Sequence, residues 1–367
     1  MAEQIKIIVS DCHLSAGRQF EGQLNPHEDF HFDGEMVDLL EYFSSGEYGN
    51  GRDVEFFING DFFDFLNVPY YGEFEDAITE AISLYKCEAI IQGHPRVMQA
   101  IRAFAALPGK RVTYLIGNHD ADLFFPQVRA RILREWAPEG THGQVKLIAD
   151  VDRVDFGAGV EVRHGNQFEA SNLLNFEIPL LTDFLDDPVL NLPWGSIYIL
   201  KIINRLRWER EHLDKVRPLK VFVLFGLLLD PWFTLKFFFL SGFYFLKTRF
   251  IWSPRRRSRL KVTLGILKQE TKLFPDLEAQ AREVLNERPE LKTIIFGHTH
   301  RPMDKVYPDG TQYINTGTWT KMLNLDWSSL GSPVRRTFAL VRIEGLESRC
   351  ELRQWVGEHS PHKTFNG

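Results

Sequence analysis

The sequence predicts a layered α/β domain that is interrupted by a long apolar insertion. Short β-branched runs alternate with helical segments over residues 1–169, and strand-like runs return after residue 262. This order is typical of sheets covered by helices. The composition changes between residues 170 and 262. We therefore expect a first core part (1–169), an apolar helical insertion (170–262) and a second core part (263–367).

Seven runs are short, apolar and rich in β-branched residues, as buried strands are. They are Ile5–Ser10, Val54–Asn59, Val112–Ile116, Val160–Arg163, Thr293–Phe296, Gln312–Ile314 and Phe338–Ile343. Asp33–Phe43 has helical spacing, and Asp33 is the expected N-cap. Residues 75–106 are also expected to be helical, with an interruption near Gly93-His94-Pro95.

The bulk composition narrows the class of protein. With 44% hydrophobic and 25% charged residues, the 367-residue chain is typical of a folded globular protein. A net charge of −6 does not favour nucleic-acid binding. The three cysteines form no even-numbered framework, which indicates a reducing compartment. The first residues lack the pattern of a signal peptide, so we expect a cytoplasmic protein.

Five polar clusters each follow a strand-like run. They are Asp11-Cys12-His13, Gly60-Asp61-Phe62-Phe63-Asp64, Gly117-Asn118-His119-Asp120, His164-Gly165-Asn166 and Gly297-His298-Thr299-His300. Sites in open α/β folds form at the carboxyl ends of strands, where loops converge. One Gly-Asp pair alone would indicate only a turn. Five clusters in succession predict a shared metal site.

The residue types in these clusters suit two divalent metal ions. The candidate ligands are two aspartates, one asparagine and four histidines: Asp11, His13, Asp61, Asn118, His164, His298 and His300. Residues i and i+2 of a strand share a side, which predicts that Asp11 and His13 reach one ion and that His298 and His300 do likewise. Mixed oxygen and nitrogen donors suit Mn, Fe or Zn better than Ca or Mg. Asp61 has the two oxygens needed to bridge two ions.

The series of clusters resembles the calcineurin-like metallophosphoesterases, whose motifs run D-x-H, G-D-x-x-D, G-N-H-D/E, a later H and G-H-x-H. The resemblance covers residues 5–169 and 290–319 and includes every ligand position. It implies a four-layer αββα fold, in which two mixed sheets are flanked by helices. It also implies one ion on Asp11, His13, Asp61 and His300, and a second ion on Asp61, Asn118, His164 and His298.

The resemblance implies hydrolysis in which a metal-activated hydroxide attacks phosphorus. His119 is expected to be the general acid at the leaving oxygen and not a ligand. Asp120 is expected to orient His119, with a helix N-cap as its alternative role. Asp64 is expected to support a histidine ligand or to stabilise a turn. Cys12 is expected to point into the core.

Three features resemble the branch of UDP-2,3-diacylglucosamine pyrophosphatases. These are Gly297-His298-Thr299-His300-Arg301-Pro302, the segment Tyr313-Ile314-Asn315-Thr316-Gly317-Thr318-Trp319, and a sizeable insertion after His164. The branch implies a nucleotide-lipid pyrophosphate substrate at the membrane surface and Mn as the usual metal. This chain departs from the best-studied members, which carry Arg at the position of His119, and its insertion is longer and more aromatic.

The insertion contains twelve aromatic residues in the thirty-two from Val221 to Trp252. Asp230-Pro231 and Lys236 interrupt the apolar runs, so a membrane span is not expected. Seven basic residues with no acid among them lie at the end of this segment and just after it: Lys247, Arg249, Arg255, Arg256, Arg257, Arg259 and Lys261. They favour a hairpin that enters one leaflet of an anionic membrane. A cap over the site or a homodimer contact is the alternative.

The leading functional prediction is therefore metal-dependent hydrolysis of a lipid-linked phosphoester or pyrophosphate on the inner face of the membrane. A phosphodiesterase, nuclease or phosphatase acting on a soluble substrate is the alternative, with the insertion as a dimer or partner contact. A scaffold that has lost catalysis is disfavoured, because all seven ligand positions and His119 are present.

Overall fold

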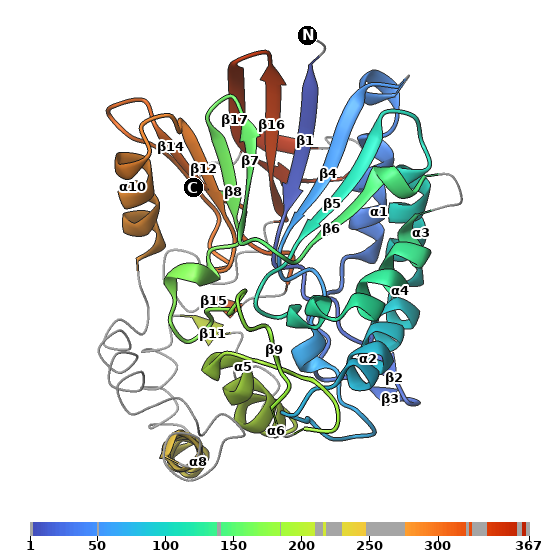
Figure 1. Cartoon of the computed structure of the whole chain (residues 1–367), viewed down its shortest axis with the longest axis vertical. Helices are drawn as coiled ribbons and strands as arrows, with labels where there is room; N and C mark the ends of the chain where they lie inside the picture. The colour runs from blue at the N-terminus through green and yellow to red at the C-terminus, as the bar shows by residue number, and fades with distance from the viewer. Residues whose placement is uncertain are drawn as a thin grey trace.

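The computed structural model describes residues 3–49, 51–137, 141–183, 185–209, 216–217, 230–246, 276–320, 323–324, 336–357 and 362–364. Within these ranges two mixed β-sheets stack against each other and helices cover their outer sides (Figure 1). The predicted α/β fold with two mixed sheets flanked by helices is confirmed.

The larger sheet has the strand order β18-β17-β16-β1-β4-β5-β6. Its strands are β1 (Gln4–Val9), β4 (Asp53–Asn59), β5 (Lys110–Leu115), β6 (Val145–Ile148), β16 (Thr337–Glu344), β17 (Glu347–Trp355) and β18 (His362–Thr364). β1, β4, β5 and β6 are parallel, and β16 pairs antiparallel with β1. The carboxyl ends of the four parallel strands therefore lie at one edge of this sheet.

The smaller sheet has the strand order β13-β14-β12-β8-β7. Its strands are β7 (Arg153–Gly157), β8 (Val160–Arg163), β12 (Thr293–Phe296), β13 (Met303–Val306) and β14 (Gln312–Asn315). The three central strands β8, β12 and β14 are parallel. All seven strands predicted from the sequence are present as β1, β4, β5, β8, β12, β14 and β16, and they differ from the predictions only at their ends.

Helices complete the outer layers. α1 (Asp33–Tyr42), α3 (Pro95–Ala105) and α4 (Pro126–Trp136) lie on the larger sheet, and α10 (Leu277–Glu287) lies on the smaller one (Figure 1). α2 (Glu80–Gly93) packs beside α4. Three two-stranded pairs are formed by β2 (Gln19–Phe20) with β3 (Gln23–Leu24), β9 (Leu180–Leu181) with β10 (Val189–Leu190), and β11 (Val216–Arg217) with β15 (Leu323–Asn324).

The core follows from the two-residue period of the strands. In β1, Ile5, Ile7 and Val9 belong to the cluster under the helices, whereas Ile8 belongs to the cluster between the sheets. Both faces of this strand are thus buried, which explains its nearly continuous apolar run. Beyond Val9, where β1 ends, the chain enters the loop that carries Asp11 and His13.

The described part of the predicted insertion, residues 170–262, contains helices at that same end of the molecule (Figure 1). α5 (Trp194–Tyr198) continues through a π-helical turn at Ile199–Ile203 into α6 (Asn204–Arg207), and α8 (Pro231–Leu246) packs against this segment. None of the helices in the described part of the chain has the length and hydropathy that a membrane-spanning helix requires. Residues 221–229 and 247–261, which carry part of the predictions for this segment, lie outside the described residues.

The predicted break in the second helical region is confirmed, because His94 separates α2 from α3. The predicted N-cap at Asp33 is wrong. Phe32 occupies that position, and Asp33 is the first residue of α1. The Asp33 carboxylate instead accepts a hydrogen bond from His94 Nδ1 at 2.9 Å, a tertiary contact that the local spacing could not reveal.

His94 lies between two carboxylates. Its Nε2 atom is 3.1 Å from Glu28 Oε2, and Glu28 also accepts the backbone N–H of Gly17 at 2.7 Å. Burial alone would lower the pKa of His94, but the hydrogen bonds to Asp33 and Glu28 outweigh it and raise the pKa to about 9. The charged imidazole thus joins the loop after His13 to the start of α3.

This network predicts a pH-dependent stability. A raised histidine pKa stabilises the fold fully below the unfolded value near 6.5, and the stabilisation is lost as the pH rises through about 9. We expect His94 to contribute about 3 kcal/mol to the fall in the free energy of unfolding across this window. Urea unfolding at pH 6.5 and pH 10 measures it. The His94→Gln variant should lack this component, and an identical pH dependence in both proteins would contradict the prediction.

Candidate metal centre

The structure brings the predicted ligands together at the carboxyl ends of five strands. Those from the first three clusters follow β1, β4 and β5 of the larger sheet, and those from the last two follow β8 and β12 of the smaller sheet. Their carboxylates and imidazoles form three groups able to hold a metal ion: Asp11, His13 and His300; His13, Asp61 and His119; and Asp61, His164 and His298. In each group the ligand atoms lie within 4.8 Å of one another.

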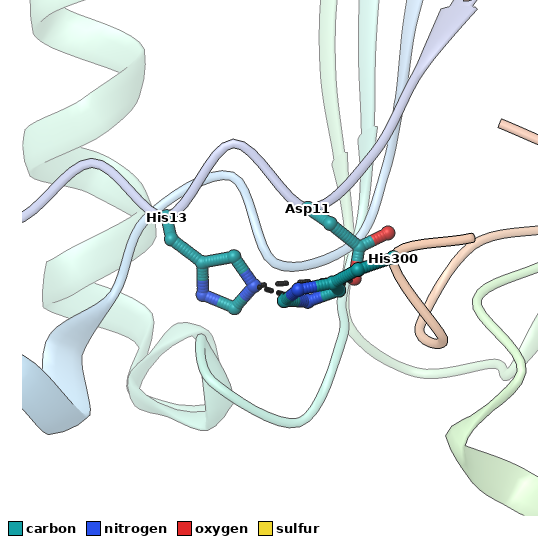
Figure 2. Close-up of side chains that lie close together, drawn as sticks. All are labelled: Asp11, His13 and His300. Carbon is teal, nitrogen blue, oxygen red and sulfur yellow. Dashed lines mark hydrogen bonds and ion pairs between the residues drawn. The ribbon is translucent and has the colours of Figure 1, made fainter. Parts of the chain in front are cut away.

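The first group joins the two sheets. His13 Nε2 is 3.0 Å from His300 Nε2, and His300 Nε2 is 3.3 Å from Asp11 Oδ1. Figure 2 shows the His13 and His300 rings pointing toward each other from separate chain segments, with the Asp11 carboxylate beside His300. The facing ring nitrogens leave a position where one cation would contact all three side chains.

Asp61 is common to the other two groups. Its Oδ2 atom is 3.1 Å from His164 Nε2 and 3.9 Å from His13 Nε2. Its Oδ1 atom accepts the backbone N–H of His119 at 2.8 Å. Asn118 is the residue that precedes His119 in this loop. Asp61 is 1% exposed, so the carboxylate that these two groups share is buried.

One prediction about these ligands is wrong. Asp11 and His13 do meet at one site, but His298 and His300 fall in different groups. The strand argument fails because Asp11, His13, His298 and His300 lie beyond the ends of β1 and β12. Their backbones turn into the left-handed region, with φ of 51°, 53°, 69° and 59°, respectively, where side chains do not alternate as they do in a strand.

The left-handed residues mark a strained part of the backbone. Asp61 also has a positive φ, at 52°, and such conformations are uncommon outside glycine. Backbone hydrogen bonds between the loops fix them, from Asp11 N to the Gly60 carbonyl at 3.2 Å and from His13 N to the Asp61 carbonyl at 3.0 Å. These hydrogen bonds therefore hold the candidate ligands in their positions.

Three glycines of the clusters are required because side chains of candidate ligands lie too close to them to leave room for a Cβ atom. A Cβ atom on Gly60 would collide with the His164 ring, and one on Gly117 would collide with the Asp61 carboxylate. A Cβ atom on Gly297 would collide with the Asp11 carboxylate. The glycines preceding Asp61, Asn118 and His298 thus allow the loops to pack around the ligands.

Hydrogen bonds on the outer side of the rings direct lone pairs into the site. His164 Nδ1 donates to the Asn59 carbonyl at 2.8 Å, and His13 Nδ1 donates to Asp64 Oδ2 at 3.1 Å. In the neutral rings each Nε2 atom then carries the lone pair. Asn118 Oδ1 is buried and has no hydrogen-bond donor within the described ranges. These electron-rich atoms are a donor set that fits divalent metal ions.

The electric field of the site also favours positive charge. Burial alone would lower the pKa of His164, but the carboxylates of Asp61 and Asp11 raise it to about 10. The pKa of Asp61 is well below its usual value despite complete burial, because histidines surround it. A cation is therefore stabilised between these groups.

His119 is oriented by Asp64. His119 Nδ1 is 3.0 Å from Asp64 Oδ1, and the other Asp64 oxygen binds His13. Asp64 Oδ1 also accepts the backbone N–H of Asn67 at 3.2 Å. Asp64 thus makes both contacts predicted for it, one with a candidate histidine ligand and one that stabilises a turn.

The structure corrects the orienting role predicted for Asp120. Its carboxylate accepts hydrogen bonds from Tyr114 Oη and from the backbone N–H of Gly117, each at 2.5 Å, so it shapes the loop that carries Asn118. Asp120 also occupies the N-cap of a short 3-10 helix, Ala121–Phe124, although its side chain makes no cap hydrogen bond. Burial and the charge of Asp61 raise the pKa of Asp120 to about 7.

Sequence reasoning missed two residues that contact candidate ligands. Glu169 Oε2 lies 2.6 Å from His298 Nε2, and the Ser10 hydroxyl donates to Asp11 Oδ2. Neither residue belongs to one of the five clusters as defined, and nothing in a single sequence distinguishes them from ordinary loop residues. Cys12 is 0% exposed and lies in the core, as predicted.

Among solved structures, the chain is similar to a dimetal phosphatase from Danio rerio, at 10% identity, 98% coverage of each chain and a TM-score of 0.39. It is also similar to Vps29 from Chaetomium thermophilum, at 10% identity, with 100% of this chain and 94% of that chain covered and a TM-score of 0.33. A predicted phosphoesterase from Streptococcus pneumoniae TIGR4 is 13% identical, with 100% and 98% covered and a TM-score of 0.27. Similarities of this size carry no argument about function.

The comparison with curated proteins finds no match. The comparison with family models does: residues 7–302 match the model described as calcineurin-like phosphoesterase. This range includes all five clusters. The chain belongs to the calcineurin-like phosphoesterase family, and it is a hydrolase that acts on phosphoesters.

Proposed function

We propose that the protein hydrolyses a phosphoester or pyrophosphate bond in a lipid-linked substrate at the inner face of a membrane, as UDP-2,3-diacylglucosamine pyrophosphatases do. Two divalent ions, expected to be Mn, would be held at the metal centre. One would bind Asp11, His13, Asp61 and His300, and the other would bind Asp61, Asn118, His164 and His298. The place of Asp61 between the two groups supports this assignment.

When bound, the ions would activate a water molecule as nucleophile and neutralise phosphoryl oxygens. His119 would supply the proton. With its Nδ1 atom bound to Asp64, Nε2 is the atom left to protonate the leaving oxygen. Burial alone would lower the pKa of His119, but Asp64 and Asp61 raise it to about 9. The protonated ring, which these carboxylates favour, is the form that a general acid requires.

The observation that carries the lipid-linked substrate is an exposed apolar stripe on α8. Trp232, Leu235, Phe239 and Phe243 are 83%, 54%, 73% and 48% exposed. Their spacing of three and four residues places them on one side of the helix. The only charged residue of α8, Lys236, is paired with Glu209. Exposed apolar surface of this kind marks a contact with a membrane or another protein.

The opposite side of α8 is packed. Phe233 is buried, and Phe237 and Leu240 lie against the α5–α6 segment. The helix has 16 residues and is therefore about 24 Å long at 1.5 Å per residue. It is suited to lie along a membrane surface with the stripe immersed. The seven basic residues that follow α8 in the sequence would attract anionic lipids at about 1 kcal/mol each.

The insertion is attached to loops near the metal centre. Asn204 Nδ2 in α6 donates to the Leu66 carbonyl at 2.8 Å, two residues beyond Asp64. Lys201 Nζ donates to the Phe74 carbonyl at 2.7 Å. α8 lies at the end of the molecule where the parallel strands end (Figure 1). A membrane bound there would present lipid headgroups to the end that carries the metal centre.

The test compares a soluble ester, bis-p-nitrophenyl phosphate, with UDP-2,3-diacylglucosamine in mixed micelles, both with Mn²⁺. The double variant Trp232→Ser/Phe239→Ser should reduce kcat/KM for the lipid at least about tenfold and leave the soluble ester unchanged, because each buried aromatic contributes roughly 1.5–3 kcal/mol. Its control is Leu24→Ser/Leu346→Ser, which alters residues that are 82% and 83% exposed elsewhere.

The same variants distinguish the alternative, a soluble substrate with α8 as a homodimer contact. In that case the stripe variant would convert a dimer to a monomer in sedimentation, and wild-type protein would not bind anionic vesicles. Equal effects on both substrates would also contradict the proposal of a lipid-linked substrate.

A further inference from the structure

Glu169 stands where the chain leaves the first core part and enters the insertion. It follows a single 3-10 turn, Asn166–Phe168, that begins two residues after His164. Its Oε2 atom is 2.6 Å from His298 Nε2, and the two side chains are 16% and 9% exposed. The carboxylate that follows β8 therefore contacts a candidate ligand that follows the neighbouring strand β12.

This contact fixes which nitrogen of His298 faces the metal centre. Glu169 accepts a hydrogen bond from Nε2–H, so the lone pair of the neutral ring is on Nδ1. His298 belongs to the group with Asp61 and His164. The opposite arrangement holds at His13, where Nδ1 binds Asp64 and Nε2 is left for the ion. Asp64 thus lies on the outer side of His13, and Glu169 lies on the outer side of His298.

Glu169 is itself bound to the insertion. Its Oε1 atom accepts the Ser171 hydroxyl at 3.0 Å. The Ser171 carbonyl in turn accepts the backbone N–H of Gly195 in α5 at 2.7 Å. Asn166 Nδ2 also donates to the Asn172 carbonyl at 2.9 Å, which closes the turn around Glu169. A short series of hydrogen bonds therefore runs from α5 to His298.

We propose that Glu169 is a positioning residue for His298, and that it links the insertion to the ion held by Asp61, Asn118, His164 and His298. The inference rests on the proposed two-metal function. Carboxylates behind metal-binding histidines hold the ring in place and increase its basicity, and their loss typically reduces metal affinity by about 10–100-fold. Asp64 would do the same for the other ion through His13.

The experiment titrates Mn²⁺ into chelator-treated full-length protein by calorimetry and counts bound Mn by elemental analysis. Wild type should bind two equivalents. Glu169→Gln should weaken one equivalent by about 10–100-fold and leave the other unchanged. Glu169→Ala, which cannot accept the hydrogen bond at all, should weaken it at least as much. Ser171→Ala should shift the same equivalent by a smaller factor. Glu177→Gln, an exposed glutamate in the same segment, is the matched control.

The melting temperature of the metal-free protein separates positioning from a purely structural role. It should be unchanged in Glu169→Gln. A lower melting temperature together with equal weakening of both equivalents would overturn the proposal, as would two unchanged equivalents in both Glu169 variants. Wild-type protein that binds fewer than two Mn would overturn the proposed two-metal function itself, and this inference with it.

Discussion

Replacement of Asp61 by asparagine is expected to reduce kcat/KM for bis-p-nitrophenyl phosphate by at least about 10³-fold. Asp61 is the one carboxylate present in both the group around His13 and the group around His164. The variant keeps the side-chain volume but loses the charge, so the two groups that share Asp61 would both lose an anionic ligand. Initial rates at several Mn²⁺ concentrations, together with the Mn content of the protein, measure the effect.

The matched control is Asp150→Asn, a charge change at an exposed residue that follows β6. It should have wild-type activity. An Asp61→Asn enzyme that kept more than a tenth of the activity, at unchanged Mn content, would show that Asp61 does not bridge the ions.

Replacement of His119 by glutamine is expected to have an effect that depends on the leaving group. A general acid contributes about 10²–10⁴-fold when the leaving oxygen is strongly basic. The loss should therefore be that large for an alkyl phosphoester and small for a p-nitrophenyl ester, whose leaving group departs without a proton. Asp64 holds His119 Nδ1 at 3.0 Å and also contacts His13, so at saturating Mn²⁺ Asp64→Asn should show the same trend more weakly.

Mn binding provides the control for the His119 variant. Since His119 is proposed to donate a proton and not to bind an ion, His119→Gln should keep two Mn equivalents. Equal losses for the two leaving groups, or loss of a Mn equivalent, would instead indicate that His119 is a ligand.

The sequence predicts which residues form the site better than it predicts how their side chains are arranged. The strands before Asp11, Asp61 and His164 are apolar runs bounded by glycine or polar residues, and such local signals survive in the fold. The strand-alternation argument paired His298 with His300, and the structure separates them. Left-handed backbone beyond a strand end depends on contacts with other loops, which no local pattern encodes.

The hydrogen-bond partners of the histidine ring nitrogens also could not be predicted from local sequence patterns. Asp64 and Asp120 both follow a ligand closely in the sequence, and proximity favoured Asp120 as the partner of His119. The structure gives that role to Asp64, 55 residues away, because the loop after β4 packs against the loop after β5. Glu169 presents the same case, since its partner His298 is 129 residues distant.

The placement of the ligands at the ends of both sheets has a mechanical consequence. Each proposed ion would take ligands from the β1, β4 and β5 side and from the β8 and β12 side. Bound metal would then act as a cross-link that clamps one end of the sandwich, without any disulfide among the three cysteines. Because such ions bind only the native arrangement, saturation at about 1,000 times Kd would add about 4 kcal/mol to stability for each ion. Amide hydrogens near this end would exchange with solvent more slowly, so that the catalytic cofactor would also be part of the scaffold.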